Sequence, residues 1–333
     1  MENLTRYKLT YKIGKKYKKM DKIKTYFPNI VGQENVKRSL AFYIDGHEAN
    51  SIVPHLMFTA PRGCGKTTIA EAFARNLKHE GAPKRLITLN CAGLKNLNQF
   101  FNLFVIPYIS DKDCTVLFDE ASEIPRDVAM ALLTILNPNP RNRNEFSYED
   151  YSFEFDFSRQ SFMFATTEGQ SIFHALMDRM ERIDLEEYEI NHLGEILMLG
   201  LDGYEVDDVS LYEMSKTLRG NARAAQKMSV KVRQYLDQND KKEFNMGDWN
   251  ALRKALSIIP MGLTNGELTL LRVLKRKKST RLTELVAITG NSRRSIQADY
   301  EMYPTKLGLI SIQPEGRCLT GKGQDYLKKL DRS

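Results

Sequence analysis

The stretch Ala60-Pro61-Arg62-Gly63-Cys64-Gly65-Lys66-Thr67 decides the fold class of this 333-residue chain. It follows an apolar run at residues 56–58 and precedes a helical pattern over residues 68–77. A strand, a glycine-rich loop and a helix in this order form a phosphate-binding loop. The stretch therefore predicts a nucleotide-binding α/β domain.

The residue types of this loop suit phosphate binding. Two glycines let backbone N–H groups close around phosphate oxygens, the lysine reaches the terminal phosphates, and Thr67 can ligate Mg²⁺. Ala60 stands where the usual motif has glycine, which is harmless if its φ stays negative. The residues expected to contact the nucleotide here are Arg62, Gly63, Cys64, Gly65, Lys66, Thr67 and Thr68.

A second run, Thr115-Val116-Leu117-Phe118-Asp119-Glu120, is a hydrophobic strand that ends in two acids. At such a strand end, Asp119 can hold the Mg²⁺ shell while Glu120 polarises the attacking water. An isolated Asp-Glu pair is usually a solvated strand end, and an isolated loop motif has false positives. Their order and contexts together predict ATP binding and hydrolysis, with ATP and Mg²⁺ as cofactors.

The composition is that of a globular protein with two or three domains, since 42% of the residues are hydrophobic and 27% are charged. No apolar run reaches the length of a membrane span, and the Lys-rich start lacks the apolar core of a secretory signal. We therefore expect a cytoplasmic protein. Its four cysteines lack paired metal-ligand spacing, which predicts reduced thiols without zinc or disulfides.

The net charge of +7 is unevenly distributed. Residues 1–25 hold nine Lys and Arg against two acids, and residues 262–333 hold fourteen against seven, so the middle of the chain is acidic. Two basic ends suggest contact with a polyanion, nucleic acid being favoured over membrane. The basic run at residues 15–19 fits a nucleic-acid-binding arm and a solvated tail equally well.

Strand and helix patterns alternate from residue 26 to residue 186, which predicts a doubly wound parallel sheet. Strands are expected at 55–59, 86–90, 114–118 and 162–166, and helices at 34–48, 66–78, 94–104, 125–136 and 170–177. Residues 187–260 are mainly helical. Helices at 265–276, 281–289 and 292–301, a strand at 309–313 and a turn at 314–317 predict a winged helix over residues 261–333.

Aromatic and polar residues alternate over residues 145–155 around Glu149-Asp150, which predicts a β-hairpin. Its aromatic face fits a docking surface for a partner, and it fits packing on its own domain equally well.

From about Tyr26 to its end the chain resembles the RuvB family, the AAA+ motors that drive branch migration of Holliday junctions in bacteria. The resemblance implies an AAA+ core, a helical lid and a C-terminal winged helix. It rests, besides the two motifs above, on Ile30-Val31-Gly32-Gln33-Glu34-Asn35-Val36-Lys37, Ala165-Thr166-Thr167, Leu176-Met177-Asp178-Arg179, Arg219-Gly220-Asn221-Ala222-Arg223 and Gly316-Arg317-Cys318-Leu319-Thr320.

The resemblance also implies roles for single residues. Thr167 resembles the sensor-1 residue near the γ-phosphate, Arg223 the sensor-2 arginine of the lid, and Arg179 the finger given to a neighbouring subunit. Read without the family, both arginines would be surface ion-pair residues. The adenine-binding site would be formed by the segment from Pro28 to Val31, which contains Ile30 and Val31, and by Tyr188, although Tyr188 fits a packing role equally well.

For DNA, Arg317 matches the wing arginine of the family, and Arg293 and Arg294 near the start of the third helix offer further phosphate contacts. A solvated basic face is the alternative. The family also implies duplex or branched DNA and a homo-oligomeric ring, with a hexamer expected, as partners, and a cytoplasmic, nucleoid-associated location.

The chain departs from the family pattern in four places. It has Asp119-Glu120-Ala121-Ser122 where the family usually has Asp-Glu-Ile-His, and Leu176-Met177-Asp178-Arg179 where the family has Leu-Arg-x-Arg. The segment at 145–155 differs from the family hairpin that docks RuvA, so a RuvA-like adaptor there is an expectation only. The longer basic extension before Tyr26 could replace a DNA adaptor electrostatically.

Taken together, the sequence predicts an ATP-dependent DNA translocase that resembles RuvB, with Lys66, Glu120, Thr167 and Arg179 as its catalytic residues. Two alternatives stay open. One is an AAA+ helicase loader, clamp loader or replication initiator. The other is a DNA-binding protein that uses nucleotide without hydrolysis, which an intact Glu120 argues against.

Overall fold

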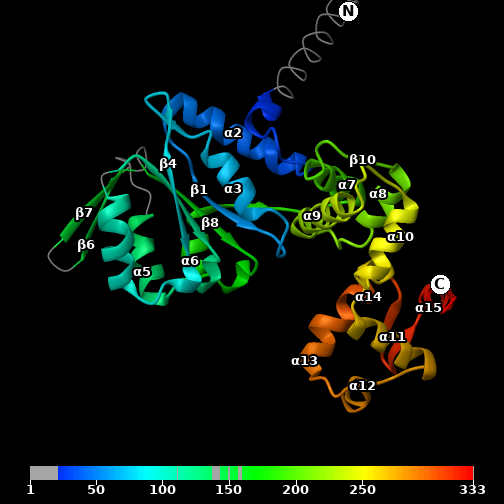
Figure 1. Cartoon of the computed structure of the whole chain (residues 1–333). Helices are drawn as coiled ribbons and strands as arrows, with labels where there is room; N and C mark the ends of the chain where they lie inside the picture. Colours follow the sequence, from blue (N-terminus) through cyan, green and yellow to red (C-terminus); the bar gives the residue numbers. More distant parts are fainter. Residues whose placement is uncertain (1–21, 111, 137–142, 149–150, 157–159, 333) are drawn as a thin grey trace, which may run out of the picture. The chain divides into compact units, whose positions relative to one another are not determined.

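The computed structural model describes residues 22–110, 112–136, 143–148, 151–156 and 160–332. The chain divides into two compact units (Figure 1). The first runs to Leu199 and also contains Gly220–Lys227, and the second contains Gly200–Arg219 and the residues from Met228 onward. The predicted boundaries after residues 25, 186 and 260 stay predictions.

The first unit is built on a five-stranded parallel sheet. Its strands are β1 (His55–Thr59), β4 (Arg85–Asn90), β5 (Cys114–Asp119), β8 (Gln160–Thr166) and β9 (Met180–Asp184). They lie in the order β4-β5-β8-β1-β9 and pair in parallel throughout. Parallel strands share one carboxyl edge, so the residues that follow β1, β5 and β8 meet there. The predicted doubly wound α/β fold is confirmed.

Two hydrophobic layers cover the sheet because alternate residues of each strand face opposite sides. Leu56 and Phe58 of β1 pack with α2 (Glu34–Asn50) and α3 (Lys66–Ala74). Met57, between them, joins the opposite layer with α4 (Leu97–Phe100), α5 (Arg126–Ile135) and α6 (His174–Met177). Figure 1 shows α2 and α3 on one side of the sheet and α5 and α6 on the other.

The sequence prediction missed three strands of this unit. The edge strand β9 was not predicted because its residues are mostly exposed and polar, so it lacks the apolar run that identified the central strands. A short hairpin, β2 (Lys78–His79) with β3 (Ala82–Pro83), replaces the expected end of the helix at 66–78. The helix expected at 94–104 continues as a π-helical segment, Phe101–Ile109, that contains Pro107.

The predicted hairpin is confirmed. β6 (Arg143–Tyr148) and β7 (Tyr151–Asp156) pair antiparallel, with Phe146 opposite Phe153 and Tyr148 opposite Tyr151. The turn at 149–150 lies outside the described residues.

The second unit begins with short helices. These are α8 (Asp208–Ser215), the C-terminal part of α9 (Ala222–Gln238) and α10 (Met246–Ala255), with a parallel pair of two-residue strands, β10 (Glu205–Val206) and β11 (Glu243–Phe244). Helix α7 (Ile190–Leu199) belongs to the first unit and directly precedes this region in the chain.

The winged helix follows in the same unit. It contains α11 (Asn265–Arg276), α12 (Leu282–Thr289), a third helical segment and the antiparallel wing strands β12 (Ile310–Gln313) and β13 (Gly316–Leu319), before α15 (Gly321–Leu330). The third segment is longer than predicted, because α13 (Arg293–Ser295) continues through π-helical residues Ile296–Glu301 into α14 (Met302–Lys306). Leucines of α11, Leu285, Ile296 and Leu309 form its core. No helix among the described residues is long and apolar enough to cross a membrane.

Candidate nucleotide site

The residues of the two sequence motifs meet at one cavity of the first unit. Its volume is about 410 Å³, within the size range of small-molecule sites. The predicted residues in its wall are Arg62, Gly63, Gly65, Lys66, Thr67, Thr68, Asp119, Glu120, Thr167 and Arg223. They come from the loop after β1, the start of α3, the ends of β5 and β8, and the start of α9.

The phosphate loop depends on two glycines in left-handed backbone conformations. Gly63 has φ +81° and Gly65, immediately before α3, has φ +87°. A Cβ on Gly63 would overlap the side-chain oxygen of Asn221. Both positions therefore exclude ordinary L side chains, which leaves the loop N–H groups free to surround an anion at the start of α3.

Lys66 is half-buried and its ammonium group donates to carbonyls of its own loop. Nζ lies 2.8 Å from the Ala60 oxygen and 3.2 Å from the Pro61 oxygen. Burial lowers the pKa of Lys66, and the positive charges of Arg223 and Arg62 act in the same direction, whereas Asp119 opposes them. A phosphate bound beside the Lys66 ammonium group would counter this lowering of the pKa, because an adjacent negative charge favours the protonated form.

Thr67 and Asp119 provide the oxygen atoms for a metal. Thr67 Oγ1 donates to Asp119 Oδ2 over 3.2 Å, which joins the start of α3 to the end of β5. A hydroxyl and a carboxylate on the phosphate side of the cavity are the ligand types that Mg²⁺ takes in such sites, so the residues fit this ion.

Glu120 and Thr167 lie immediately past the ends of neighbouring strands, β5 and β8, and both are exposed at the cavity. Glu120 has a left-handed backbone, φ 54° and ψ 47°, and its N–H donates to Asp119 Oδ1 over 3.0 Å. A non-glycine residue in this region costs of order 1–3 kcal/mol and is found most often at functional sites. The strained backbone carries the Glu120 side chain into the cavity wall.

The start of α9 lies against the phosphate loop. The Asn221 side-chain amide donates to the Arg62 carbonyl over 3.0 Å, while its oxygen caps α9 by accepting from the Ala224 N–H over 3.0 Å. The Arg223 N–H donates to the Gly63 carbonyl over 3.2 Å. These bonds place the exposed Arg223 side chain at the cavity.

Five predicted residues of the ATP site are not in the cavity wall. Cys64 is buried, with its sulfur directed to the Gly220 carbonyl at 3.9 Å. Ile30 and Val31 are half-buried, and Ile30 packs against the layer that contains α2. Arg179 is half-buried and its Nη1 donates to the Ala175 carbonyl over 2.5 Å.

Tyr188, the fifth of these residues, lies next to the phosphate loop. Its hydroxyl is 3.3 Å from where a Cβ on Gly65 would stand, and burial raises its pKa. Tyr188 also lines a second, smaller pocket with Gln33 and His192. The structure therefore places Tyr188 beside the phosphate loop and outside the cavity wall. Contact of Tyr188, Ile30 and Val31 with adenine stays a prediction.

The three arginines predicted to bind DNA fall into two groups in the second unit. Arg293 and Arg294 are exposed at the start of the third helical segment. Arg317 forms two bonds to Glu301, from Nε to Oε2 over 2.7 Å and from Nη2 to Oε1 over 3.0 Å. Its side chain is only 13% exposed and that of Glu301 only 7%.

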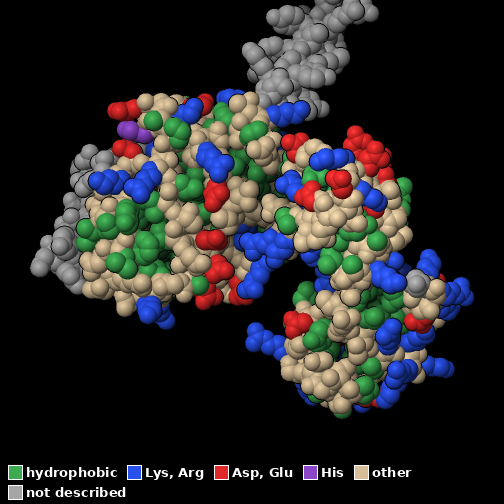
Figure 2. Space-filling view, in the orientation of Figure 1, with side chains coloured by type: hydrophobic (Ala, Val, Ile, Leu, Met, Phe, Trp, Pro, Cys, Tyr) green, Lys and Arg blue, Asp and Glu red, His purple; other side chains and the backbone are tan. Residues whose placement is uncertain are grey.

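This ion pair distinguishes Arg317 from Arg293 and Arg294. Its guanidinium is engaged by a buried carboxylate, which raises its pKa and neutralises its charge. The pair holds the wing strand β13 to the third helical segment, while contact of Arg317 with DNA stays a prediction. Figure 2 shows other Lys and Arg side chains over the visible face of the winged helix.

Several residues of the cavity wall were not predicted. They are Ala92, Ser122, Glu123, Ala165, Thr166, Glu168, Ala222 and Gln226. The acids Glu123 and Glu168 follow predicted strands, as Glu120 does, so their position after a strand was a usable signal. Asn221 was quoted without a role, although an asparagine directly before a helical pattern is a typical N-cap.

Comparisons with known proteins agree with this geometry. Residues 56–188 match the family model "ATPase family associated with various cellular activities (AAA)" and residues 260–328 match "RuvB C-terminal winged helix domain".

Relatives and solved structures cover most of the chain. The "Holliday junction branch migration complex subunit RuvB" of Neorickettsia sennetsu is 23% identical over 90% of this chain and 91% of its own length. The subunit of the same name from Campylobacter lari is 25% identical over 91% and 90%. The solved structure of the Thermotoga maritima RuvB Holliday junction branch migration motor is similar in fold, with a TM-score of 0.69 and 21% identity over 90% of this chain and 95% of that chain.

The chain thus combines a parallel sheet and a phosphate cavity that match the AAA family model with a C-terminal region that matches the RuvB winged helix, so it is similar to RuvB-type AAA+ ATPases in both regions.

Proposed function

We propose that this chain is an ATP-driven DNA motor that drives branch migration of Holliday junctions in recombination and repair. One observation carries the proposal: the phosphate-binding lysine, the two metal-ligand candidates, the water-polarising acid and the two sensor residues meet at a single cavity, in a chain that also has a RuvB-type winged helix. These residues are Lys66, Thr67, Asp119, Glu120, Thr167 and Arg223.

The cavity residues suit phosphoryl transfer. Lys66 and the N–H groups of the loop bind the terminal phosphates, and Thr67 and Asp119 would hold Mg²⁺, which supplies charge neutralisation when bound. Glu120 orients and polarises the attacking water, while Thr167 and Arg223 contact the γ-phosphate region from two further elements. Each of these groups acts mainly by position and charge, as expected for a reaction with little covalent chemistry on the protein.

Arg179 is proposed as the finger donated to a neighbouring subunit. Its absence from the wall of its own cavity, within the described residues, fits a residue that acts in trans. This role requires a ring, and we propose a hexamer that couples hydrolysis to DNA translocation as a helicase does. The buried Nε of Arg179 has no partner among the described residues, so this side chain is not fully satisfied within the subunit.

DNA contacts are proposed for Arg293 and Arg294, which are exposed, unlike Arg317, whose guanidinium Glu301 engages. The β6–β7 hairpin is proposed as the docking element for a RuvA-like adaptor, because its register sets aromatic residues opposite one another. We propose a cytoplasmic, nucleoid-associated location, as these partners require.

The test is ATP hydrolysis by the purified protein without DNA, with linear duplex and with a four-way junction, at several salt concentrations. A motor of this kind hydrolyses ATP faster with DNA, and the stimulation falls as salt rises, because phosphate contacts release counterions. Stimulation that depends on an added helicase or clamp would instead identify a loader. Hydrolysis that DNA leaves unchanged would contradict the proposal.

A further inference from the structure

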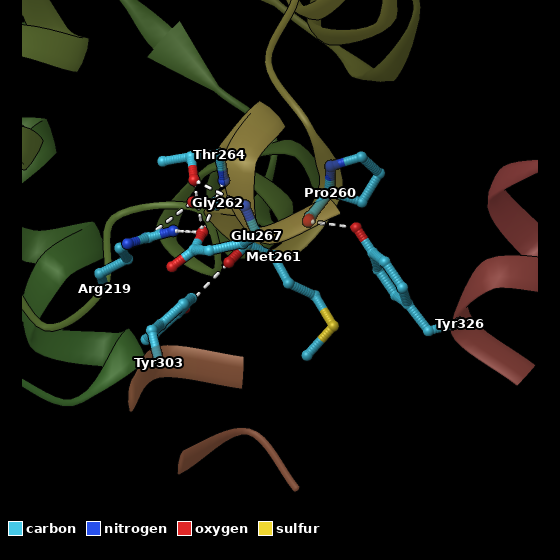
Figure 3. A network of polar contacts seen from close by, with 8 residues as sticks. All are labelled: Arg219, Pro260, Met261, Gly262, Thr264, Glu267, Tyr303 and Tyr326. Carbon is cyan, nitrogen blue, oxygen red and sulfur yellow. Dashed lines mark hydrogen bonds and ion pairs between the residues drawn. The ribbon is translucent and has the colours of Figure 1, made fainter. Parts of the chain in front are cut away.

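An arginine that the nucleotide site does not use is enclosed by a polar network in the second unit (Figure 3). Arg219 donates from Nε to the Gly262 carbonyl over 2.7 Å and forms an ion pair with Glu267. Its guanidinium carbon lies 4.0 Å from the centre of the Tyr303 ring, close enough for a cation–π contact. Three bonding modes thus hold one side chain on residues that belong to the winged helix.

Glu267 is the centre of this network. Its side chain is fully buried, and Oε2 accepts from the Thr264 N–H over 2.6 Å and from the Thr264 hydroxyl over 3.0 Å. Thr264 in turn caps α11, so the two residues form a capping box. The other oxygen, Oε1, has no partner among the described residues, so Arg219 supplies the cation that compensates this buried charge.

The backbone around the network is also held by hydrogen bonds and a close contact. Tyr303 and Tyr326 donate their hydroxyls to the carbonyls of Met261 and Pro260, both over 2.9 Å. Gly262 has φ +70°, and a Cβ there would overlap the Thr217 carbonyl oxygen. The residues before α11 therefore lie directly against the segment that leads to Arg219.

Arg219 is also the last residue of the second unit before the chain enters the nucleotide unit. Arg219 and Gly220 both have left-handed backbones, with φ 56° and φ 70°. Just beyond them, Asn221 and Arg223 bond to the phosphate loop. The segment from Arg219 to Arg223 thus has one end fixed to the winged helix and the other fixed to the phosphate loop.

We infer that Arg219 is a positioning residue that transmits the nucleotide state of the phosphate loop to the winged helix through Glu267. A shift of Asn221 and Arg223 when a γ-phosphate enters or leaves moves the rigid turn at Arg219. The bonds from the Arg219 guanidinium to Glu267 and Gly262 then transmit that movement to α11, which begins at this network. The inference rests on the proposed function, because it gives the winged helix a nucleotide-dependent task.

The test measures the dissociation constant for duplex DNA, with and without a non-hydrolysable ATP analogue, for wild type and for Arg219→Met. Allosteric couplings of this kind change affinity by about 5- to 150-fold. In wild type, the two dissociation constants for DNA, with and without the analogue, should therefore differ by a ratio of at least about fivefold. In Arg219→Met the ratio should fall to about one, while DNA affinity without nucleotide stays within about twofold. By linkage, the effect of DNA on analogue affinity should vanish by the same factor.

The chain offers a matched control, Lys241→Met. Asp248 is also the acid of a capping box, its side chain is 4% exposed, and Lys241 Nζ lies 2.6 Å from its Oδ1. This pair lies in the same unit but stays within the residues that precede the winged helix. Lys241→Met should keep the wild-type ratio at a comparable loss of stability.

Arg219→Lys serves if Arg219→Met fails to fold. A lysine keeps the charge but cannot bond Gly262 and Glu267 as a planar fork, so the ratio should be intermediate. An unchanged ratio in both Arg219 variants would overturn the inference, as would an equal loss in Lys241→Met. If wild type dissociates junctions but shows a ratio of one, the inference fails and the proposed function stands.

Discussion

Functional residues of the phosphate cavity and of the winged helix were both predicted from sequence motifs. The structure brings those of the cavity together and separates those of the winged helix. At the cavity, the ends of three strands and the starts of two helices bring the predicted residues together, because parallel strands share a carboxyl edge. In the winged helix, three predicted arginines separate into two exposed residues and one that is bonded to Glu301. A sequence motif predicts which residue stands at a given element. The fold then decides whether a buried acid lies close enough to bond that residue.

The largest expected effect is on the cavity side of this comparison. Glu120→Gln removes the group that polarises water and keeps its size, so hydrolysis should fall about 10²- to 10⁴-fold. ATP affinity should change little, because the loop and Lys66 remain. Steady-state hydrolysis and analogue binding by titration calorimetry measure both quantities. A variant that hydrolyses ATP at the wild-type rate would remove Glu120 from the mechanism.

On the winged-helix side, Arg317→Met should cost stability. Removal of one partner from a buried ion pair leaves an uncompensated carboxylate on Glu301 and typically costs about 3–5 kcal/mol. The measurement is the free energy of unfolding in denaturant. It compares Arg317→Met with Arg294→Met, a substitution at an exposed site. If the two variants were equally stable and only Arg317→Met lost DNA binding, Arg317 would be assigned as a DNA contact.

Gly63→Ala tests the loop geometry. An alanine at φ +81° costs about 1–2 kcal/mol, and its Cβ would displace the Asn221 amide from the loop. We expect weaker ATP binding and a lower melting temperature. Gly93→Ala is the control, since no atom of the described residues would lie within 4 Å of its Cβ and its φ is not positive. ATP affinities that match between the two variants would contradict the assigned loop conformation.

The smallest expected effect is that of the exposed arginines. Arg293→Ala with Arg294→Ala should leave stability within about 0.5 kcal/mol, because neither side chain is buried. The slope of log affinity against log salt should fall by about one for each phosphate interaction that the substitutions remove. An unchanged slope for the double variant would assign these arginines to a solvated surface.

Particular residues show how far the sequence could predict this structure. The central strands β1, β5 and β8 were predicted because each is a continuous apolar run buried on both faces. The edge strand β9 is polar and exposed, so its pairing with β1 comes from position in the sheet and leaves no local signal. The third helical segment runs on to Lys306, past the predicted end at residue 301, through a π-helical stretch that precedes Pro304.

The site residues were likewise predicted where they lie within a local sequence motif. Lys66, Thr67, Asp119 and Glu120 lie within two local motifs, and their meeting follows from strand order. Arg219 and Arg317 each bond an acid that lies 48 and 16 residues away along the chain. No pattern in the sequence links these pairs, so only the folded chain shows which arginine is available to bind a ligand.

The most direct test of the central claim is dissociation of a labelled four-way junction by wild type, by Glu120→Gln and by the Arg293/Arg294 double alanine variant, with ATP. An autonomous motor predicts dissociation by wild type, none by Glu120→Gln, and dissociation by the double variant that disappears at lower salt than in wild type. If wild type hydrolyses ATP on junction DNA but leaves the junction intact, with and without a RuvA-type adaptor, the branch-migration account is contradicted.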